Sequence, residues 1–270
     1  MSATTQQAPA PTRATASSEI RLSFGRVVRS ETIKLLSLRS TWWSLGVTAV
    51  LAIGISLMMA WASRSFGGGF EPVMAIVAPM QFTMLVAGIL GAMTITGEYS
   101  TGMIRSTLTA EPRRGAVVLA KALVVAVVLA VTTVVTSTVA VLATIPVFAD
   151  AGIDWSDPDA SIVPLALGVL AMACIAVLGL GWGFIIRNGA GAIAATVGLL
   201  FVLPIVLSLF SLGGEAWAWI VDLGQYLPAH AAQVVTSGSS DDFWVGLLTL
   251  VGWPAAALIG GWVVLRTRDA

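Results

Sequence analysis

The sequence of 270 residues carries no formal net charge, and 57% of its residues are hydrophobic while only 10% are charged. An ordinary soluble domain is about a quarter charged, so a chain with so few charges could not cover its own surface in water. The composition therefore excludes an ordinary soluble protein, and the charge balance gives no reason to expect a nucleic-acid partner. Cys174 is the only cysteine, which excludes an internal disulfide.

The N-terminal segment divides into a polar part and an amphipathic part. Residues 1–18 are rich in Ala, Pro, Ser and Thr, so we expect a disordered tail rather than a cleavable signal peptide. Residues 19–41 predict a basic amphipathic helix that lies in the membrane interface. Three basic side chains on this helix are expected to reach phosphate headgroups of membrane lipids: Arg21, Arg29 and Lys34. A plain membrane anchor with no further role is the alternative.

Apolar windows then follow along the chain, each close to the length of about 20 residues that a helix needs to cross a ~30 Å hydrocarbon layer. None contains Asp, Glu, Lys or Arg, and one such charge in mid-bilayer would cost roughly 2.5–3.5 kcal/mol. We therefore predict an all-α transmembrane domain over residues 42–265 and a short tail over 266–270. The six predicted spans are 42–61, 73–95, 122–148, 162–186, 190–212 and 243–265.

The distribution of basic residues predicts the orientation. If the spans are as above, all but one of the 14 Lys and Arg residues fall on the side that holds both termini, and the exception is Arg64. Basic residues favour the cytoplasmic side. Both termini are therefore predicted to be cytoplasmic, in a multi-pass protein of the plasma membrane.

The connection over residues 97–121 is the longest one on this predicted cytoplasmic side. Gly97, Gly102 and Pro112 interrupt it and leave room for a short helix around Thr101–Thr109. A plain link between two helices needs only a handful of residues, so the length favours a surface that contacts a partner. A solvated loop whose arginines only enforce the topology is the alternative.

On the opposite side, residues 215–227 are too short to span the membrane and contain two Trp, one Tyr, Glu215 and Asp222. Aromatic residues of this kind prefer the membrane interface. We expect a helix that dips into the outer leaflet or lies on it.

The sequence contains none of the following catalytic, metal-binding or nucleotide-binding motifs. The sequence lacks a Gly-x-x-x-x-Gly-Lys-Ser/Thr loop for nucleotide phosphates, and it lacks His-Glu-x-x-His, Cys-x-x-Cys and Gly-x-Ser-x-Gly. We therefore predict no enzyme, no metal site and no cofactor, and the absence of charges within the spans argues against an ion-driven carrier. Four polar residues of the spans could line a transport pathway, although helix packing explains them equally well. They are Gln81, Thr83, Thr196 and Ser208.

Three segments carry a resemblance to a known family. They are SETIKLLSLRSTWWSL at Ser30–Leu45, GEYSTGMIRSTLTAEPRR at Gly97–Arg114, and QYLPAHAAQVV at Gln225–Val235. In this order, and with six spans, the chain resembles the membrane subunits of bacterial type-2 ABC transporters of the drug and polysaccharide exporter class. Met103 stands where many relatives have Thr or another residue.

The resemblance implies a permease subunit that moves substrate by alternating access. It implies pairing with a second permease subunit, in a homodimer or heterodimer, and a separate cytoplasmic ATPase that binds the ATP. The path would lie between the subunits. The resemblance also assigns the ATPase contact to Gly97, Glu98, Tyr99, Thr101, Gly102, Arg105, Arg113 and Arg114. The alternatives are a non-transporting scaffold or sensor that works with an ATPase, and a secondary carrier.

Overall fold

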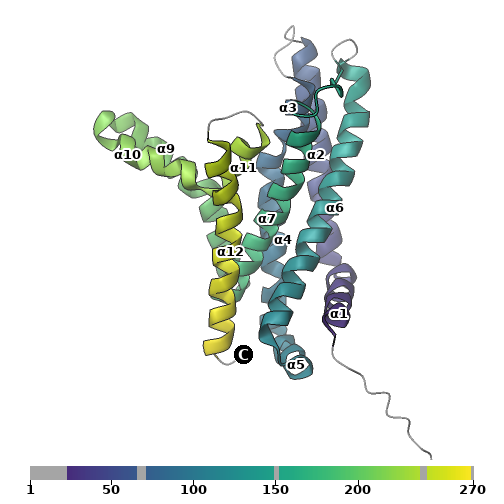
Figure 1. Ribbon diagram of the computed structural model, residues 1–270, viewed down its shortest axis with the longest axis vertical. Coiled ribbons are helices and arrows are strands. Elements are labelled where there is room, and N and C mark those ends of the chain that lie inside the picture. Colours follow the sequence, from purple (N-terminus) through teal and green to yellow (C-terminus); the bar gives the residue numbers. More distant parts are fainter. Residues whose placement is uncertain (1–22, 66–70, 149–151, 238–241, 269–270) are drawn as a thin grey trace, which may run out of the picture.

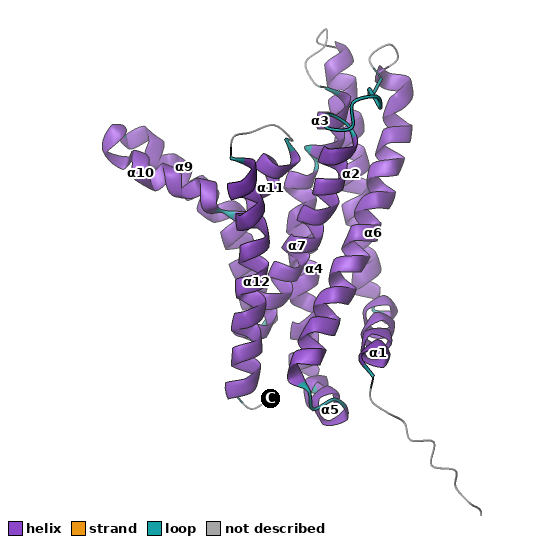
Figure 2. Cartoon of the chain, in the orientation of Figure 1, coloured by secondary structure: helices purple, strands orange, loops and turns teal. Residues whose placement is uncertain are grey.

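The computed structural model describes residues 23–65, 71–148, 152–237 and 242–268, and every regular element in these ranges is helical (Figure 2). Six stretches are long and apolar enough to cross a membrane, which confirms the predicted all-α class and the number of spans. They stand side by side in one bundle, except that the outer part of the fifth stretch leaves it (Figure 1). The tail predicted over residues 1–18 lies outside the described residues.

The helices of the first half extend beyond the predicted spans. They are α1 (Phe24–Ser37), α2 (Arg39–Ser65), α3 (Pro72–Val77), α4 (Met80–Thr101), α5 (Met103–Ala110) and α6 (Arg114–Phe148). The predicted amphipathic helix corresponds to α1, which ends before the predicted residue 41 because Leu38 is extended and α2 starts at Arg39. Helix α4 continues past its apolar window and includes Glu98, and α6 begins before its window and includes Arg114 and Lys121.

The second half contains the remaining spans and the connection between them. Its elements are α7 (Ile162–Ile186), α8 (Gly189–Val197), η1 (Gly198–Val202), α9 (Leu203–Leu209), η2 (Phe210–Gly213), η3 (Glu215–Trp217), α10 (Ala218–Asp222), η4 (Leu223–Tyr226), α11 (Pro228–Thr236) and α12 (Phe243–Thr267). Here η1 is a π-helix, and η2 to η4 are 3-10 turns.

The two ends of the bundle differ in charge. Helices α1 and α5 and the C-terminal end of α12 lie at one end (Figure 1), and we call it the basic end. Helices α3 and α11 lie at the opposite end, with carboxylates at Glu71, Asp157 and Asp159; we call it the acidic end. The positive-inside rule predicts that the basic end faces the cytoplasm.

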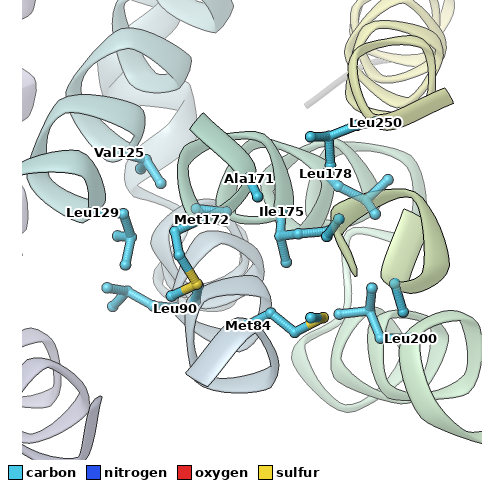
Figure 3. Close-up of a cluster of buried hydrophobic side chains, with 14 of the residues drawn as sticks. Met84, Leu90, Val125, Leu129, Ala171, Met172, Ile175, Leu178, Leu200 and Leu250 are labelled. Atoms are coloured by element: carbon cyan, nitrogen blue, oxygen red, sulfur yellow. The ribbon is translucent and has the colours of Figure 1, made fainter. Parts of the chain in front are cut away.

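Helices α4 and α7 form the most extensive helix pair of the bundle. A Cβ atom built on Gly91 would lie 1.9 Å from the carbonyl oxygen of Ala176, and one on Gly179 would lie 1.9 Å from that of Gly88. Only glycine permits such a close approach of two backbones, as is common where helices pack in membranes. Around this contact, buried apolar side chains from α4, α6, α7 and α12 form the core (Figure 3).

The fifth span is bent. The π-helix η1 interrupts it immediately before Pro204, which has no N–H to donate to the carbonyl one turn earlier. Beyond this bend, α9 and α10 project sideways from the bundle (Figure 1). We call residues 203–226 the lateral arm. The helix predicted over residues 215–227 consists of three short consecutive pieces, η3, α10 and η4, and Gly214, with φ of +78°, immediately precedes them.

The close α4–α7 contact predicts that a larger residue at Gly179 will destabilise the protein. Gly179→Ala should lower the free energy of unfolding by about 1–3 kcal/mol or more, because the new methyl group overlaps a backbone oxygen that cannot move aside. Thermal unfolding of the purified protein in detergent measures this. Gly54→Ala on α2 is the matched control, since its Cβ would meet no atom within 4 Å. Equal stability of the two variants would contradict the packing.

Candidate functional site

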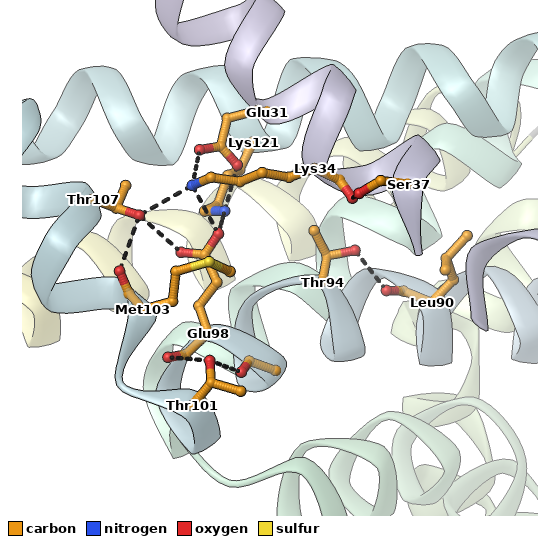
Figure 4. Close-up of polar contacts among 11 residues, drawn as sticks. Glu31, Lys34, Ser37, Leu90, Thr94, Glu98, Thr101, Met103, Thr107 and Lys121 are labelled. Carbon is orange, nitrogen blue, oxygen red and sulfur yellow. Dashed lines mark hydrogen bonds and ion pairs between the residues drawn. The ribbon is translucent and has the colours of Figure 1, made fainter. Parts of the chain in front are cut away.

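At the basic end, four charged side chains from three helices meet inside the protein. We call Glu31, Lys34, Glu98 and Lys121 the charge cluster (Figure 4). The Lys121 ammonium donates to Oε2 of Glu31 at 2.5 Å and to Oε1 of Glu98 at 2.6 Å. The Lys34 ammonium donates to Oε1 of Glu31 at 2.8 Å and to Oε1 of Glu98 at 3.1 Å. The cluster thus joins α1, α4 and α6 through two lysines that share two carboxylates.

The cluster is largely closed to solvent. Lys121 is 1% exposed, and Glu98 and Glu31 are 3% and 4% exposed. Removing charges from water is costly, and mutual attraction offsets that cost only when every charge keeps its partners. Two ammonium groups and two carboxylates leave no net charge. The arrangement therefore holds only while all four side chains stay together.

Lys34 extends the cluster to α5. Its ammonium donates to the Thr107 hydroxyl at 3.0 Å. Partial burial lowers the pKa of Lys34, but its hydrogen bond and attraction to Glu31, then its contacts with Glu98, outweigh burial and raise that pKa above the usual 10.5. A raised pKa means that the ion pairs stabilise the fold fully below pH ~10.5 and are lost as the pH rises through the folded-state value. The predicted contact of Lys34 with lipid headgroups is wrong, because its charge turns inward to these two carboxylates.

Helix α5 lies across the basic end between α4 and α6. The turn into it is made by Gly102, whose φ of +71° is a left-handed conformation that suits glycine. On its inner face, Ile104 is 2% exposed and packs in a cluster that includes Ile95 and Phe184. A polar contact at Thr107 and an apolar contact at Ile104 therefore fix α5 against the bundle.

Arginines fix the link from α5 to α6 and the end of α12. The carboxylate of Glu111 accepts hydrogen bonds from the guanidinium of Arg113 at 2.8 and 2.9 Å, which lowers the pKa of Glu111. Arg114 donates to the carbonyls of Leu265 and Arg266, which belong to the unpaired C-terminal carbonyls of α12. Arg187 donates at 2.9 Å to the carbonyl of Val264, which also accepts the backbone N–H of Arg268.

The predicted ATPase contact divides into an inner and an outer set. Glu98 is buried in the charge cluster, the ring of Tyr99 lies 5.2 Å from the guanidinium of Arg187, and Arg114 is engaged with α12. These three side chains make contacts within the subunit. The other residues are exposed at the basic end, where a partner could reach them: Gly97, Thr101, Gly102, Arg105 and Arg113.

The four predicted pathway residues do not come together within this subunit. Thr83 and Thr196 are buried between helices, and the Thr196 hydroxyl donates to the Ala192 carbonyl at 2.8 Å, as expected for helix packing. Ser208 is exposed on the lateral arm. Gln81 alone lines a cavity of about 730 Å³ at the acidic end, where the side-chain amide of Gln233 donates to its oxygen. We call this the acidic-end cavity.

Hydropathy alone missed the charge cluster. Glu98 and Lys121 lie just outside the apolar windows, in the predicted connection over residues 97–121, and no apolar window includes Glu31. A signal was present in α1, where Glu31 occupies the same helix face as Val28 and Leu35, three residues before and four residues after it. A carboxylate on the apolar face of an amphipathic helix indicates a buried partner of opposite charge.

One family model matches the chain. Its description is ABC-2 family transporter protein, and the match covers residues 5–270. None of the curated proteins compared with the chain matches it.

Removing one member of the charge cluster should be costly. Lys121→Met would leave Glu31 and Glu98 close together with only Lys34 between them, so we expect a loss of about 3–5 kcal/mol in the free energy of unfolding. Thermal or denaturant unfolding in detergent measures the loss. Arg29→Met removes an exposed cation from the same end of the protein and should change stability by less than about 0.5 kcal/mol. A Lys121→Met variant as stable as Arg29→Met would show that the cluster is not held as described.

Proposed function

The chain belongs to the ABC-2 transporter family, and from this premise we propose that it is the permease subunit of an ATP-driven exporter in a bacterial plasma membrane. Membrane proteins of this family work with ABC ATPase subunits. The sequence contains no loop for nucleotide phosphates, so ATP would bind to the partner.

The observation that supports this proposal is the way α5 is held. Its exposed face presents Arg105 at the basic end, beside Thr101 and Gly102 of the turn that precedes it, and its inner face reaches the charge cluster through Thr107. A partner that docks on the exposed face would therefore act on a helix already tied to α1, α4 and α6. These helices continue into, or form, the first three spans.

This arrangement suggests how ATPase movement reaches the membrane. Closure of the ATPase dimer would displace α5, and the charge cluster would carry the displacement to α4 and α6 together, because no charge in it can separate at low cost. The spans would then tilt between an inward-open and an outward-open arrangement. In this scheme Glu98 is a positioning residue, and the exposed residues make the contact.

A second permease subunit fits the lateral arm. Leu212 and Trp219 on the arm are 84% and 62% exposed, and α9 packs mainly against η1 before it and the short pieces after it rather than on the other spanning helices. The arm also exposes the carboxylates of Glu215 and Asp222 beside these apolar side chains. A neighbouring subunit that packs on the arm would cover both kinds of surface, and it would place the bent fifth span at the contact between subunits.

Gly102 provides a test of coupling. Gly102→Val should leave membrane insertion intact but should uncouple ATP hydrolysis from export at least tenfold, because a β-branched residue resists a φ of +71° and would reorient α5. The measurement is export per ATP hydrolysed in proteoliposomes that contain the copurified ATPase. Gly252→Ala on α12 is the control, since it meets no atom within 4 Å. Unchanged coupling in Gly102→Val would remove α5 from the proposed path.

The orientation can be tested with a single cysteine. Cys174→Ala removes the only native thiol, and Arg105→Cys then places one thiol on the exposed face of α5. A membrane-impermeant maleimide should label this thiol in inside-out vesicles and leave it unlabelled in right-side-out vesicles. A thiol placed at Glu215 serves as the control with the reverse pattern. Labelling of position 105 from outside the cell would overturn the proposal, since no cytoplasmic ATPase could reach α5.

A further inference from the structure

The acidic-end cavity has two chemically different parts. Its floor is apolar and comes from α4 and α7, with Met84, Met172 and Ile175 lining it. All three lie among the buried side chains drawn in Figure 3, and each is at most 3% exposed. Four of the nine methionines of the chain line the cavity. Methionine is flexible and polarisable, so a surface rich in it adapts to apolar ligands of varied shape.

The rim of the cavity is acidic. Glu71, Asp157 and Asp159 line it and are all exposed, and none of its described lining residues is basic. Arg64, the one basic residue predicted on this side, is not among them. Charges of one sign around a low-dielectric cavity concentrate ions of the opposite sign.

The ends of two helices also contribute to the electrostatic potential in the acidic-end cavity. Thr236 and Ser237, at the C-terminal end of α11, line the cavity, and a helix C-terminus carries partial negative charge. The N-terminal part of α7 also reaches the cavity at Pro164, but the full charges of Asp157 and Asp159 lie in the turn just before it. The balance of charges therefore favours a cation.

We propose that the acidic-end cavity binds a hydrophobic monovalent cation, whose apolar groups would rest on the methionine-lined floor while its charge stays near the carboxylate rim. An anion of the same shape would meet three carboxylates. A metal ion would need converging ligands, and among the described residues no group of three or more His, Cys, Asp or Glu side chains could hold one. The inference rests on the proposed transport function only in treating this ligand as cargo.

The test compares two ions of nearly equal shape and opposite charge. Tetraphenylphosphonium should bind the full chain in phosphatidylcholine nanodiscs at least tenfold more tightly than tetraphenylborate, after subtraction of binding to empty discs. Equilibrium dialysis or calorimetry measures both affinities. Equal or reversed affinities would overturn the proposal.

Two variants locate the binding. Glu71→Gln combined with Asp159→Asn should weaken tetraphenylphosphonium binding about tenfold, which corresponds to about 1.4 kcal/mol. Met84→Trp, which fills the floor, should abolish it. Asp157 is left intact because its carboxylate accepts hydrogen bonds from the backbone N–H groups of Asp159 and Ala160.

The control is Glu215→Gln, which removes a carboxylate of the lateral arm that does not line the cavity and should leave the affinity unchanged. Tight binding that survives both cavity variants would place the ligand elsewhere and overturn the proposal. The assay contains no ATPase, so its failure would leave the coupling role of α5 standing. Conversely, failure of the Gly102 experiment would leave the binding site standing.

Discussion

The ammonium group of Lys121 holds the basic end of the structure together. It lies between the carboxylates of Glu31 and Glu98, and it is nearly inaccessible to solvent. A single buried cation between two carboxylates would leave a net negative charge, so Lys34 is required as the second cation. That requirement brings α1 onto the bundle and gives α5 its polar anchor at Thr107. The position of α5, and with it any path from a partner to the membrane, follows from this balance of four charges.

Hydropathy predicted the six spans because each span can be recognised from its own residues alone, as an apolar stretch long enough to cross the bilayer. The charge cluster depends on pairs far apart in the sequence. Glu31 and Lys121 are 90 residues apart, and Glu98 and Lys121 are 23 residues apart, so no local window contains the interaction. Each apolar window stops before the nearest charged residue. The windows therefore leave out Glu98 and Lys121, two residues of the charge cluster. The positions of Glu98 and Arg114 in the family motif could be predicted, but not that their side chains would turn into the subunit.

The lateral arm shows a second limit of the sequence pattern. Residues 190–212 are apolar enough to predict a straight span. Pro204 is the only proline in this range, and by itself it indicates neither the size nor the direction of a bend. Whether a proline bends a helix sharply depends on what lies beside it, since neighbouring helices can hold it straight. Here the outer half of the span lacks such neighbours in its own subunit, and the π-helix η1 takes up the bend. The direction of the arm is therefore set by tertiary packing, which the sequence pattern does not report.

Helix α4 connects the two ends of the protein. Glu98 lies near its end and Gln81 near its start, about 25 Å apart along the axis at 1.5 Å per residue. The close approach at Gly91 and Gly179 clamps α7 to α4, so a tilt of α4 carries α7 with it. The floor of the acidic-end cavity, between Met84 and Met172, would then keep its shape. Helix α3 is separated from α4 by the turn at Ala78 and Pro79 and contacts α2, α6 and α7. Because α3 also contributes Val73, Met74 and Val77 to the lining, the wall of the acidic-end cavity is linked to α2, α6 and α7 as well as to α4.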